Sequence, residues 1–410
     1  MKRIIFALLL HVLSIACIAQ VKTGIDILKE IDFLPLKGKR VGLITNPTGI
    51  DRNLKSTIDI LYEADSVELV SLFAPEHGVR GDALGGENIS QTTDARTGVK
   101  VYSLYGKTYK PTTSMLQDID VLIYDIQDIG CRSYTFISTM GSAMEACAEC
   151  GVKFMVLDRP NPLGGEKVEG PLVEKNFQSF VGKYPIPYIY GLTVGELAMM
   201  LNDQGMLRNG IKADLEVIKM QGWKRDMIWE DTGLPWVLTS PHIPQPITAI
   251  YYPVSGILGE LNTISIGVGY TLPFQIFCAS WIDAIVLCDM MNSYELPGWE
   301  FRPIYAKPYY GLGQGKSMQG VQPYITDYKK ANLTLVQFYI VEAIEQLYPK
   351  NNPIRNANES RIKMFDKVCG SSKIRTTFMN SNCKVASIEK MWNEPAEQFS
   401  ERRKQYFLYY

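Results

Sequence analysis

The sequence predicts an α/β protein with a parallel sheet in its N-terminal part and a second domain after it. Apolar runs alternate with segments of helical periodicity through the first half of the chain. Several of these runs end in polar residues beside proline or glycine, which is typical of the carboxyl edge of an open sheet. With 410 residues, the chain is also longer than one typical core requires, so two domains are expected.

The predicted elements follow one another in strand–helix order after a short helical segment at Gly24–Leu34. Short apolar runs predict strands at Lys39–Pro47, Leu69–Ala74, Lys100–Tyr105, Asp120–Gly130, Val152–Leu157 and Asp214–Met220. Apolar residues at helical spacing predict helices at Asn53–Ala64, Pro111–Asp118, Cys131–Cys150 and Thr193–Asn202. This alternation favours a Rossmann-like parallel sheet with one functional edge.

Prolines are dense between Thr232 and Pro246, and we place the domain boundary there. Residues 22–245 are then the first domain and residues 246–410 the second, smaller one. The second domain mixes strands with a predicted helix at Leu333–Leu347, and the stretch PAEQFSERRKQYFLYY is expected to dock as a charged helix with an aromatic end.

The first 19 residues have the features of a secretion signal peptide. Lys2 and Arg3 precede an apolar stretch that is short for a bilayer span, and cleavage after Ala19 would fit the small residues there. We therefore expect export to the periplasm or the cell exterior. A lipid-modified Cys17 is the less favoured alternative, because Ser14 occupies a position where such sites usually carry a larger apolar residue.

The balance of charge argues against polyanionic partners. The chain has 42 basic and 43 acidic residues and no basic run, so neither nucleic acid nor an anionic membrane surface is an expected partner. The G-x-G-x-x-G, Walker and G-x-S-x-G motifs are absent, which weighs against dinucleotide, nucleotide and serine-hydrolase chemistry. One of the three histidines lies in the signal peptide, so a multi-histidine metal centre is excluded. No cofactor and no metal are predicted.

Four predicted strands end in polar side chains. Successive strand ends carry Asn46; Glu76 and His77; Asp125, Gln127 and Asp128; and Asp158, Arg159 and Asn161. Because parallel strands end at the same edge of a sheet, we expect these groups to form one site. Carboxylates, amides and an arginine suit a ligand that bears hydroxyls and an acid. Glu260 lies in apolar sequence and is a second-rank candidate, because a buried acid needs a partner.

A series of distinctive runs extends along nearly the whole mature chain: GKRVGLITNPTG, FAPEHGVRGDA, TDARTGVKVYSLYGKTYKPT, DIQDIGCRSYTF, VLDRPNPLGG, VEGP, SFVGKYPIP, GLTVGELA and LPW…TSPHIP. In this order they closely resemble the exo-β-N-acetylmuramidases (glycoside hydrolase family 171). The resemblance implies a Rossmann-like catalytic domain followed by an auxiliary α/β domain. It also implies removal of N-acetylmuramic acid from the non-reducing ends of peptidoglycan fragments.

The resemblance also assigns residues. The family's catalytic glutamate, in its PEHG motif, corresponds to Glu76, and a second acidic position corresponds to Glu87. The remaining motif positions correspond to Asp125, Gln127, Asp128, Arg132, Tyr134, Asp158, Arg159 and Asn161. The chain departs from the family pattern at Tyr190, His242, Val268 and Tyr270.

These residues favour a glycosidase. Glycoside cleavage uses one carboxyl group to protonate the leaving oxygen and another as nucleophile or base. We predict Glu76, beside His77, as the essential acid, with Glu87 or Asp125 as the second group.

The lactyl carboxylate of muramic acid would suit an arginine, because arginine binds carboxylates through two parallel hydrogen bonds. Arg159 and Arg132 are the candidates. Two other hypotheses remain open: an exported protein that binds muramic acid without catalysis, and a metal-dependent amidase or deacetylase that uses Glu76, His77 and Asp125.

Overall fold

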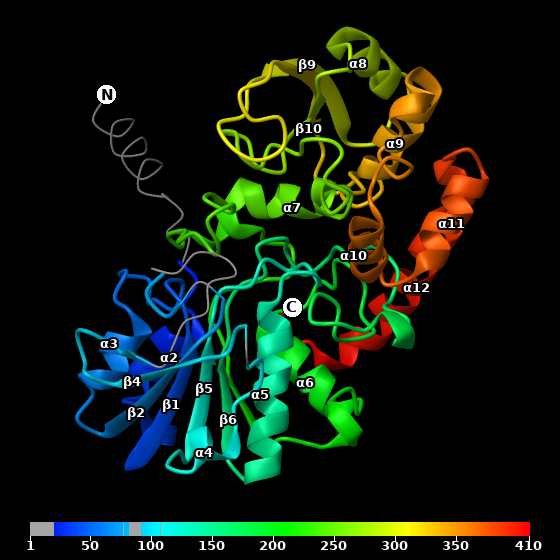
Figure 1. Cartoon of the computed structure of the whole chain (residues 1–410). Coiled ribbons are helices and arrows are strands. Elements are labelled where there is room, and N and C mark those ends of the chain that lie inside the picture. The colour runs from blue at the N-terminus through cyan, green and yellow to red at the C-terminus, as the bar shows by residue number, and fades with distance from the viewer. Residues whose placement is uncertain (1–19, 77, 82–91, 107) are drawn as a thin grey trace, which may run out of the picture.

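The computed structural model describes residues 20–76, 78–81, 92–106 and 108–410, and the predicted residues His77 and Glu87 lie outside these ranges. A large sheet flanked by helices forms the N-terminal part, and a smaller sheet with its own helices forms the C-terminal part (Figure 1). The fold class predicted from the sequence is therefore confirmed. No helix within the described ranges is both long enough and apolar enough to cross a lipid bilayer.

The first sheet has seven strands in the order β3-β4-β2-β1-β5-β6-β7. Their bounds are β1 Lys39–Thr45, β2 Val67–Ala74, β3 Thr92–Thr93, β4 Lys100–Ser103, β5 Val121–Asp125, β6 Lys153–Leu157 and β7 Leu215–Ile218. All neighbouring pairs are parallel except β3 and β4, which pair antiparallel. Strand β5 is buried along its whole length, as a parallel strand covered on both faces must be.

Helices cover both faces of this sheet. Successive strand residues point to opposite faces, so Leu43 packs in the core under α2 (Gly24–Glu30) and α3 (Thr57–Tyr62). Its neighbour Ile44 packs in the other core, with α5 (Phe136–Cys150) and α6 (Val194–Asp203). The short helix α4 (Thr113–Leu116) joins this second layer. The N-terminal part is thus a three-layer arrangement with helices on each side of the strands.

The C-terminal part contains an antiparallel sheet in the order β8-β10-β9. Its elements are α7 Pro246–Gly259, β8 Phe277–Ala279, α8 Ala284–Ser293, β9 Trp299–Ala306, β10 Met318–Ile325, α9 Val336–Leu347, α10 Glu359–Cys369, α11 Ser372–Asn380 and α12 Glu389–Arg402. Short 3-10 helices lie at Leu34–Leu36, Lys175–Phe177, Arg208–Gly210, Trp229–Thr232, Pro349–Asn351, Val385–Ser387 and Arg403–Tyr406.

The end of α12 and the segment after it return to the first sheet. Phe399 and Tyr406 pack in the same core as α5 and α6. The Tyr409 hydroxyl donates to Asp158 Oδ2 at 2.6 Å and accepts from the Met220 N–H at 2.9 Å. The aromatic end of the chain therefore docks on the first sheet, as its sequence predicts, and it covers the carboxyl end of β6.

Candidate active site

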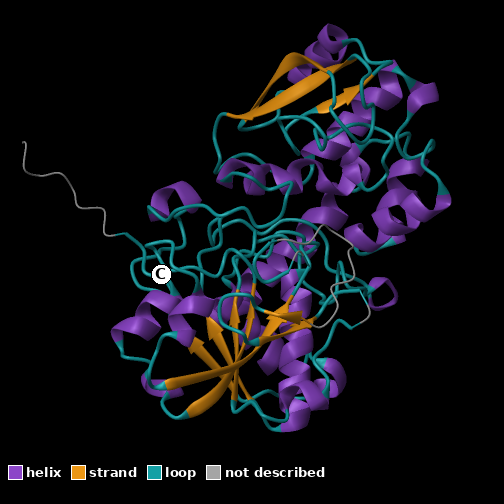
Figure 2. Ribbon diagram, turned by 60° about the vertical axis from the view of Figure 1, so that its left-hand side comes forward, coloured by secondary structure: helices purple, strands orange, loops and turns teal. Residues whose placement is uncertain are grey.

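The four strands whose ends carry the predicted site residues are neighbours in the sheet, in the order β2, β1, β5, β6. Their carboxyl ends point toward the loops that lie between the first sheet and the C-terminal part (Figure 2). This is the edge at which open α/β sheets bind ligands.

Glu76 lies in the turn that follows β2 and is half-buried. Thr135 Oγ1 donates to Glu76 Oε2 at 3.4 Å. The Tyr105 hydroxyl also hydrogen-bonds the Glu76 carboxylate; burial, and then this bond, raise the pKa of Tyr105, so it stays protonated. Gly78 completes the turn with a φ of 80°, a conformation that favours glycine. A partly accessible carboxyl group is thus held between two hydroxyl groups.

Asp125 and Arg159 form a buried ion pair between the ends of β5 and β6. Arg159 Nε donates to Asp125 Oδ1 at 2.6 Å and Nη2 to Oδ2 at 2.9 Å. Thr57 donates to the same Oδ2 at 2.5 Å, and Arg159 Nη2 also bonds the Ile50 carbonyl at 2.8 Å. The pair has the bidentate geometry that arginine forms with carboxylates. The pair uses Nε and Nη2 of Arg159.

Arg132 is buried and binds main-chain oxygens. Nη1 donates to the carbonyls of Pro171 at 2.6 Å and Ile186 at 2.7 Å, and Nη2 donates to that of Val368, in α10, at 2.6 Å. Burial lowers the pKa of Arg132 to about 10. Its guanidinium therefore ties three separate segments together at the sheet edge.

Asp128 is a buried acid with a raised pKa. Its Oδ1 accepts from the Tyr190 hydroxyl at 2.5 Å and from the Gly130 N–H at 2.7 Å. Its Oδ2 has no hydrogen-bond partner among the described residues, and neither does Oε1 of the adjacent Gln127. Burial raises the pKa of Asp128 to about 7. The carboxyl is therefore the predicted site acid that titrates near neutrality, a property common in functional sites.

Three other predicted residues shape the loops. Asn46 Oδ1 accepts from the Thr48 N–H, and Asn161 Oδ1 from the Leu163 N–H, both at 3.0 Å. Each side chain thus closes an Asx turn in the loop that follows a strand, β1 for Asn46 and β6 for Asn161. Asp158 is buried and accepts hydrogen bonds from the docked C-terminal segment and from the start of α6.

Tyr134 and Glu260 lie on the side of the site that faces α7. The Tyr134 hydroxyl donates to Thr239 Oγ1 at 2.8 Å, and its ring packs edge-on against Tyr252 of α7 at 5.8 Å. Glu260 follows α7 and is half-buried; burial raises its pKa, opposed by the charge of Arg361. The second part of the chain therefore contributes aromatic surface beside the sheet edge.

Sequence reasoning missed Tyr105 and Thr135, the two groups that contact Glu76. Tyr105 follows the end of β4, which pairs with β2 in the same sheet. Applying the strand-end rule to this strand as well would have identified Tyr105. Thr135 directly precedes α5, and its position beside Glu76 depends on tertiary packing.

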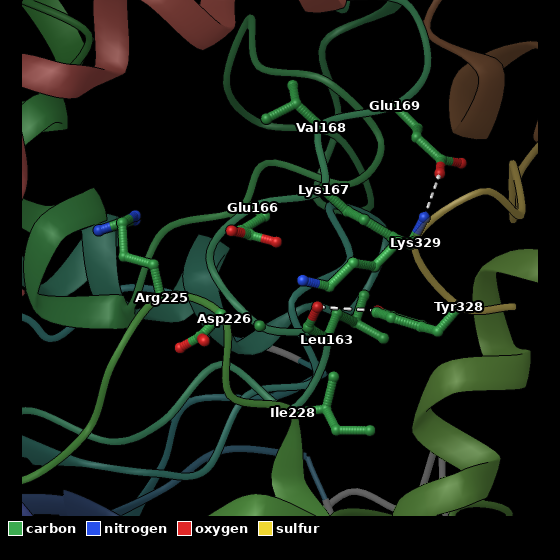
Figure 3. A pocket seen from close by; sticks show the side chains of 11 residues that line it. Leu163, Glu166, Lys167, Val168, Glu169, Arg225, Asp226, Ile228, Tyr328 and Lys329 are labelled. Carbon is green, nitrogen blue, oxygen red and sulfur yellow. Dashed lines mark hydrogen bonds and ion pairs between the residues drawn. The ribbon is translucent and has the colours of Figure 1, made fainter. Parts of the chain in front are cut away.

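A cavity of about 280 Å³ lies between the loops after β6 and residues of the C-terminal part (Figure 3). Within it, Lys167 pairs with Glu169 at 3.7 Å, and the Tyr328 hydroxyl donates to the Leu163 carbonyl at 2.8 Å. The predicted site residues do not line it. Glu76, the predicted catalytic acid, lies outside this cavity.

The metal-dependent hypothesis needs His77, which lies outside the described residues. Within the described ranges, no group of three His, Cys, Asp or Glu side chains is arranged to hold a metal ion.

Comparison with known proteins agrees with this architecture. The family models described as exo-beta-N-acetylmuramidase NamZ, N-terminal and C-terminal, match residues 41–247 and 250–409. The chain is 45% identical over 390 residues to the peptidoglycan beta-N-acetylmuramidase NamZ of Bacillus subtilis (strain 168), covering 95% of this chain and 92% of that protein.

Crystal structures of two DUF1343 family proteins from Bacteroides fragilis NCTC 9343 have the same fold. One has a TM-score of 0.92 at 53% sequence identity, and the other 0.74 at 28%. Each comparison covers 95% of this chain and 99% of the other. Matched by both family models over almost its whole described length, this chain belongs to the exo-beta-N-acetylmuramidase NamZ family.

Proposed function

We propose that the protein is a glycosidase that releases N-acetylmuramic acid from the non-reducing ends of peptidoglycan fragments, with Glu76 as its essential acid. The observation that carries this proposal is the environment of Glu76. Its carboxyl group is half-buried at the carboxyl edge of the sheet and lies between the hydroxyls of Tyr105 and Thr135. Membership of the family supports the reaction type.

The geometry suits proton donation to a leaving oxygen. A general acid must be accessible to the substrate, and the carboxylate that remains after proton transfer must be stabilised. Glu76 meets the first condition by its partial exposure and the second by the two hydroxyl groups that hydrogen-bond it. We propose that His77, its neighbour in sequence, assists and that Glu87 supplies the second carboxyl group.

The buried residues around this acid have a different proposed role. Asp125, Arg159 and Arg132 make buried hydrogen bonds within the protein. We propose that they hold the loops of the site in position and that the lactyl carboxylate is bound by other donors. Asp128 is proposed to contact the substrate or a site water, because its Oδ2 has no partner among the described residues.

The test is release of a chromophore from a β-linked aryl glycoside of N-acetylmuramic acid. The matching N-acetylglucosamine glycoside, which lacks the lactyl acid, is assayed in parallel, each with and without a chelator. We expect cleavage of the muramic acid glycoside alone, with the same rate when the chelator is present. Binding of muramic acid without cleavage would favour the non-catalytic protein, and inhibition by the chelator would favour a metal-dependent enzyme.

Glu76→Gln is expected to keep the fold and to lose at least about 100-fold in turnover, because the amide cannot donate the catalytic proton. Circular dichroism and thermal unfolding report the fold. Glu68→Gln is the matched control, because Glu68 is an exposed glutamate on the same strand β2. An active Glu76→Gln enzyme would remove Glu76 from its proposed role.

We also propose that the protein is exported and that its signal peptide is removed after Ala19. The basic residues Lys2 and Arg3, the apolar stretch and the small residues before Gln20 support this. Peptidoglycan, the proposed substrate, lies outside the cytoplasmic membrane. Mass spectrometry of the mature protein should find Gln20 as its first residue, and a retained N-terminus would contradict the proposal.

A further inference from the structure

A second cavity, of about 480 Å³, lies beside α5. Its walls come from α5, from residues 178–184 and from residues 206–208. We call it the α5 groove. Tyr109 and Phe180 are aromatic residues in its wall, and Ser142, Glu145 and Lys183 are polar ones.

Aromatic rings connect the α5 groove with Glu76. Tyr105, which hydrogen-bonds Glu76, meets Tyr109 edge-on with ring centroids 5.6 Å apart. Tyr109 then packs against Phe180 at 4.4 Å. Tyr109 is 39% exposed, so part of its ring is available to a ligand. Sugar rings pack their C–H faces on aromatic rings, so this row is suited to a saccharide that extends away from Glu76.

The α5 groove also contains unused hydrogen-bonding capacity. Lys183 Nζ lies 3.1 Å from Glu145 Oε1 and 2.7 Å from Ser142 Oγ, which leaves one of its three N–H donors. Ser179, in the wall, carries a buried hydroxyl without a partner among the described residues. Buried polar groups normally have a partner, so this atom points to a polar ligand.

Positions along helix α5 show how far the α5 groove lies from Glu76. Thr135, which contacts Glu76, directly precedes α5, whereas Ser142 and Glu145 lie about two and three turns further along it. At the helical rise of 1.5 Å per residue, these two residues are about 10 and 15 Å beyond Thr135. A ligand that reaches both Glu76 and Lys183 must therefore be longer than one sugar residue.

We propose that the α5 groove binds the glycan chain on the leaving-group side of the scissile bond. The proposal rests on the exo-muramidase activity proposed above. An exo-acting enzyme removes the terminal sugar, so all of the remaining chain extends from the leaving-group side. Tyr109 and Phe180 stack on sugar rings of that chain, and Lys183 binds a lactyl carboxylate of a later muramic acid residue. The enzyme then prefers oligosaccharides to substrates with a small leaving group.

The test compares two substrates of different length. One is the tetrasaccharide of alternating N-acetylmuramic acid and N-acetylglucosamine with muramic acid at its non-reducing end, and the other is the aryl glycoside. We expect Tyr109→Ala to lower the ratio of kcat/KM for the tetrasaccharide to that for the aryl glycoside by about 3–10-fold, since an aromatic contact contributes about 0.5–1.5 kcal/mol. Phe180→Leu should lower the same ratio.

Tyr305→Ala is the matched control, because Tyr305 is an exposed tyrosine on β9, outside the α5 groove. An unchanged ratio in both groove variants would overturn the inference. An equal loss on both substrates would also overturn it, because Tyr109 would then act through Tyr105 and Glu76. If the wild-type protein cleaves neither substrate, the proposed function itself fails, so the two failures are distinguishable.

A binding measurement on an inactive variant tests the role of Lys183 independently of catalysis. Calorimetric titration of Glu76→Gln with the tetrasaccharide should give a Kd that rises when Lys183→Met is added, because a cation that binds the carboxylate is lost. The same titration with muramic acid alone should show no such added change, since one sugar does not reach Lys183. An unchanged Kd for the tetrasaccharide would contradict the role of Lys183.

Discussion

At the scale of single residues, the acids of the sheet edge differ in what surrounds them. Asp125 is matched by Arg159 and Thr57, whereas Asp128 Oδ2 has no partner among the described residues. The Asp125 carboxylate is held by this ion pair, while burial raises the pKa of Asp128 to about 7. Neighbouring acids of one strand end thus have different hydrogen-bond environments.

The pKa of Asp128 makes stability depend on pH. Aspartate in an unfolded chain titrates near 3.9, so between about pH 4 and 7 the native state retains a proton that the unfolded state has lost. Raising the pH through this range therefore destabilises the native state through Asp128, by up to about 1.4 kcal/mol per pH unit. Asp128→Asn should remove this contribution, because its Oδ1 can still accept from Tyr190 and Gly130.

The measurement is urea unfolding of the wild type and of Asp128→Asn at pH 5, 6, 7 and 8. The free energy of unfolding of the variant, relative to the wild type, should increase as the pH rises to 7 and then level off. Asp65→Asn, at an exposed aspartate, is the control. Parallel pH profiles for the wild type and Asp128→Asn would contradict a raised pKa at this site.

The sequence could predict which side chains reach the sheet edge but not what they contact there. Strand ends and motif resemblance identified Glu76 and its neighbours. They did not reveal that Arg159 turns toward Asp125, or that Arg132 reaches carbonyls 39, 54 and 236 positions away in the chain. Contacts of such sequence separation arise from tertiary packing, so no local pattern encodes them. His77 and Glu87 remain predictions from the sequence.

At the scale of elements, strands and helices of the first part were predicted well because the apolar pattern changes period there. Helix α7 was missed: its sequence is buried on most sides and contains Gly256 and Pro253, so it lacks an amphipathic stripe. Burial stabilises this helix despite its glycine and proline. Periodicity therefore identifies half-exposed helices better than fully buried ones.

The docked segment at residues 403–409 is the element with the most direct effect on the sheet edge. Arg403 donates to the carbonyls of Gly165 and Gly191, and the Leu408 N–H donates to Glu196 Oε1 at 2.8 Å. Glu196 caps α6, so the docked segment holds both the loop after β6 and the start of α6.

Tyr409→Phe is expected to lower the free energy of unfolding by about 1–3 kcal/mol, because it leaves the buried Asp158 carboxylate and the Met220 N–H without their shared partner. Chemical denaturation measures the change. Tyr410→Phe is the control, since Tyr410 is 87% exposed. Equal stability of the two variants would show that docking depends on packing alone.

At the scale of the whole molecule, the two parts are joined through buried polar contacts. Arg132 binds Val368 of α10, Lys167 donates to the Ala331 carbonyl at 2.7 Å, and Glu169 accepts from the Thr334 N–H at 2.9 Å. Each contact connects a loop of the first sheet with a backbone group of the C-terminal part. Tyr252 of α7 packs against Tyr134 at the sheet edge, so the geometry of the candidate site depends on the relative position of the two parts.

Arg132→Met keeps much of the apolar volume and removes every donor. We expect it to lower the free energy of unfolding by at least about 2 kcal/mol, because hydrogen bonds to charged groups each contribute about 1.5–3 kcal/mol. Calorimetric unfolding should show a lower Tm. Arg302→Met, at an exposed arginine on β9, should leave the Tm nearly unchanged. A wild-type Tm in Arg132→Met would contradict this role.

The docking of Tyr409 on Asp158 also affects when the first part can finish folding during synthesis of the chain. The two residues are 251 positions apart, so the ribosome makes the whole first sheet long before it makes the group that seals its edge. Domains generally fold in order as they are synthesised. Until Tyr409 has been synthesised, the first part therefore folds without the hydrogen bond from the Tyr409 hydroxyl to Asp158. The final folding step of the first part therefore follows synthesis of the second, and a fragment ending at residue 245 would retain that open edge.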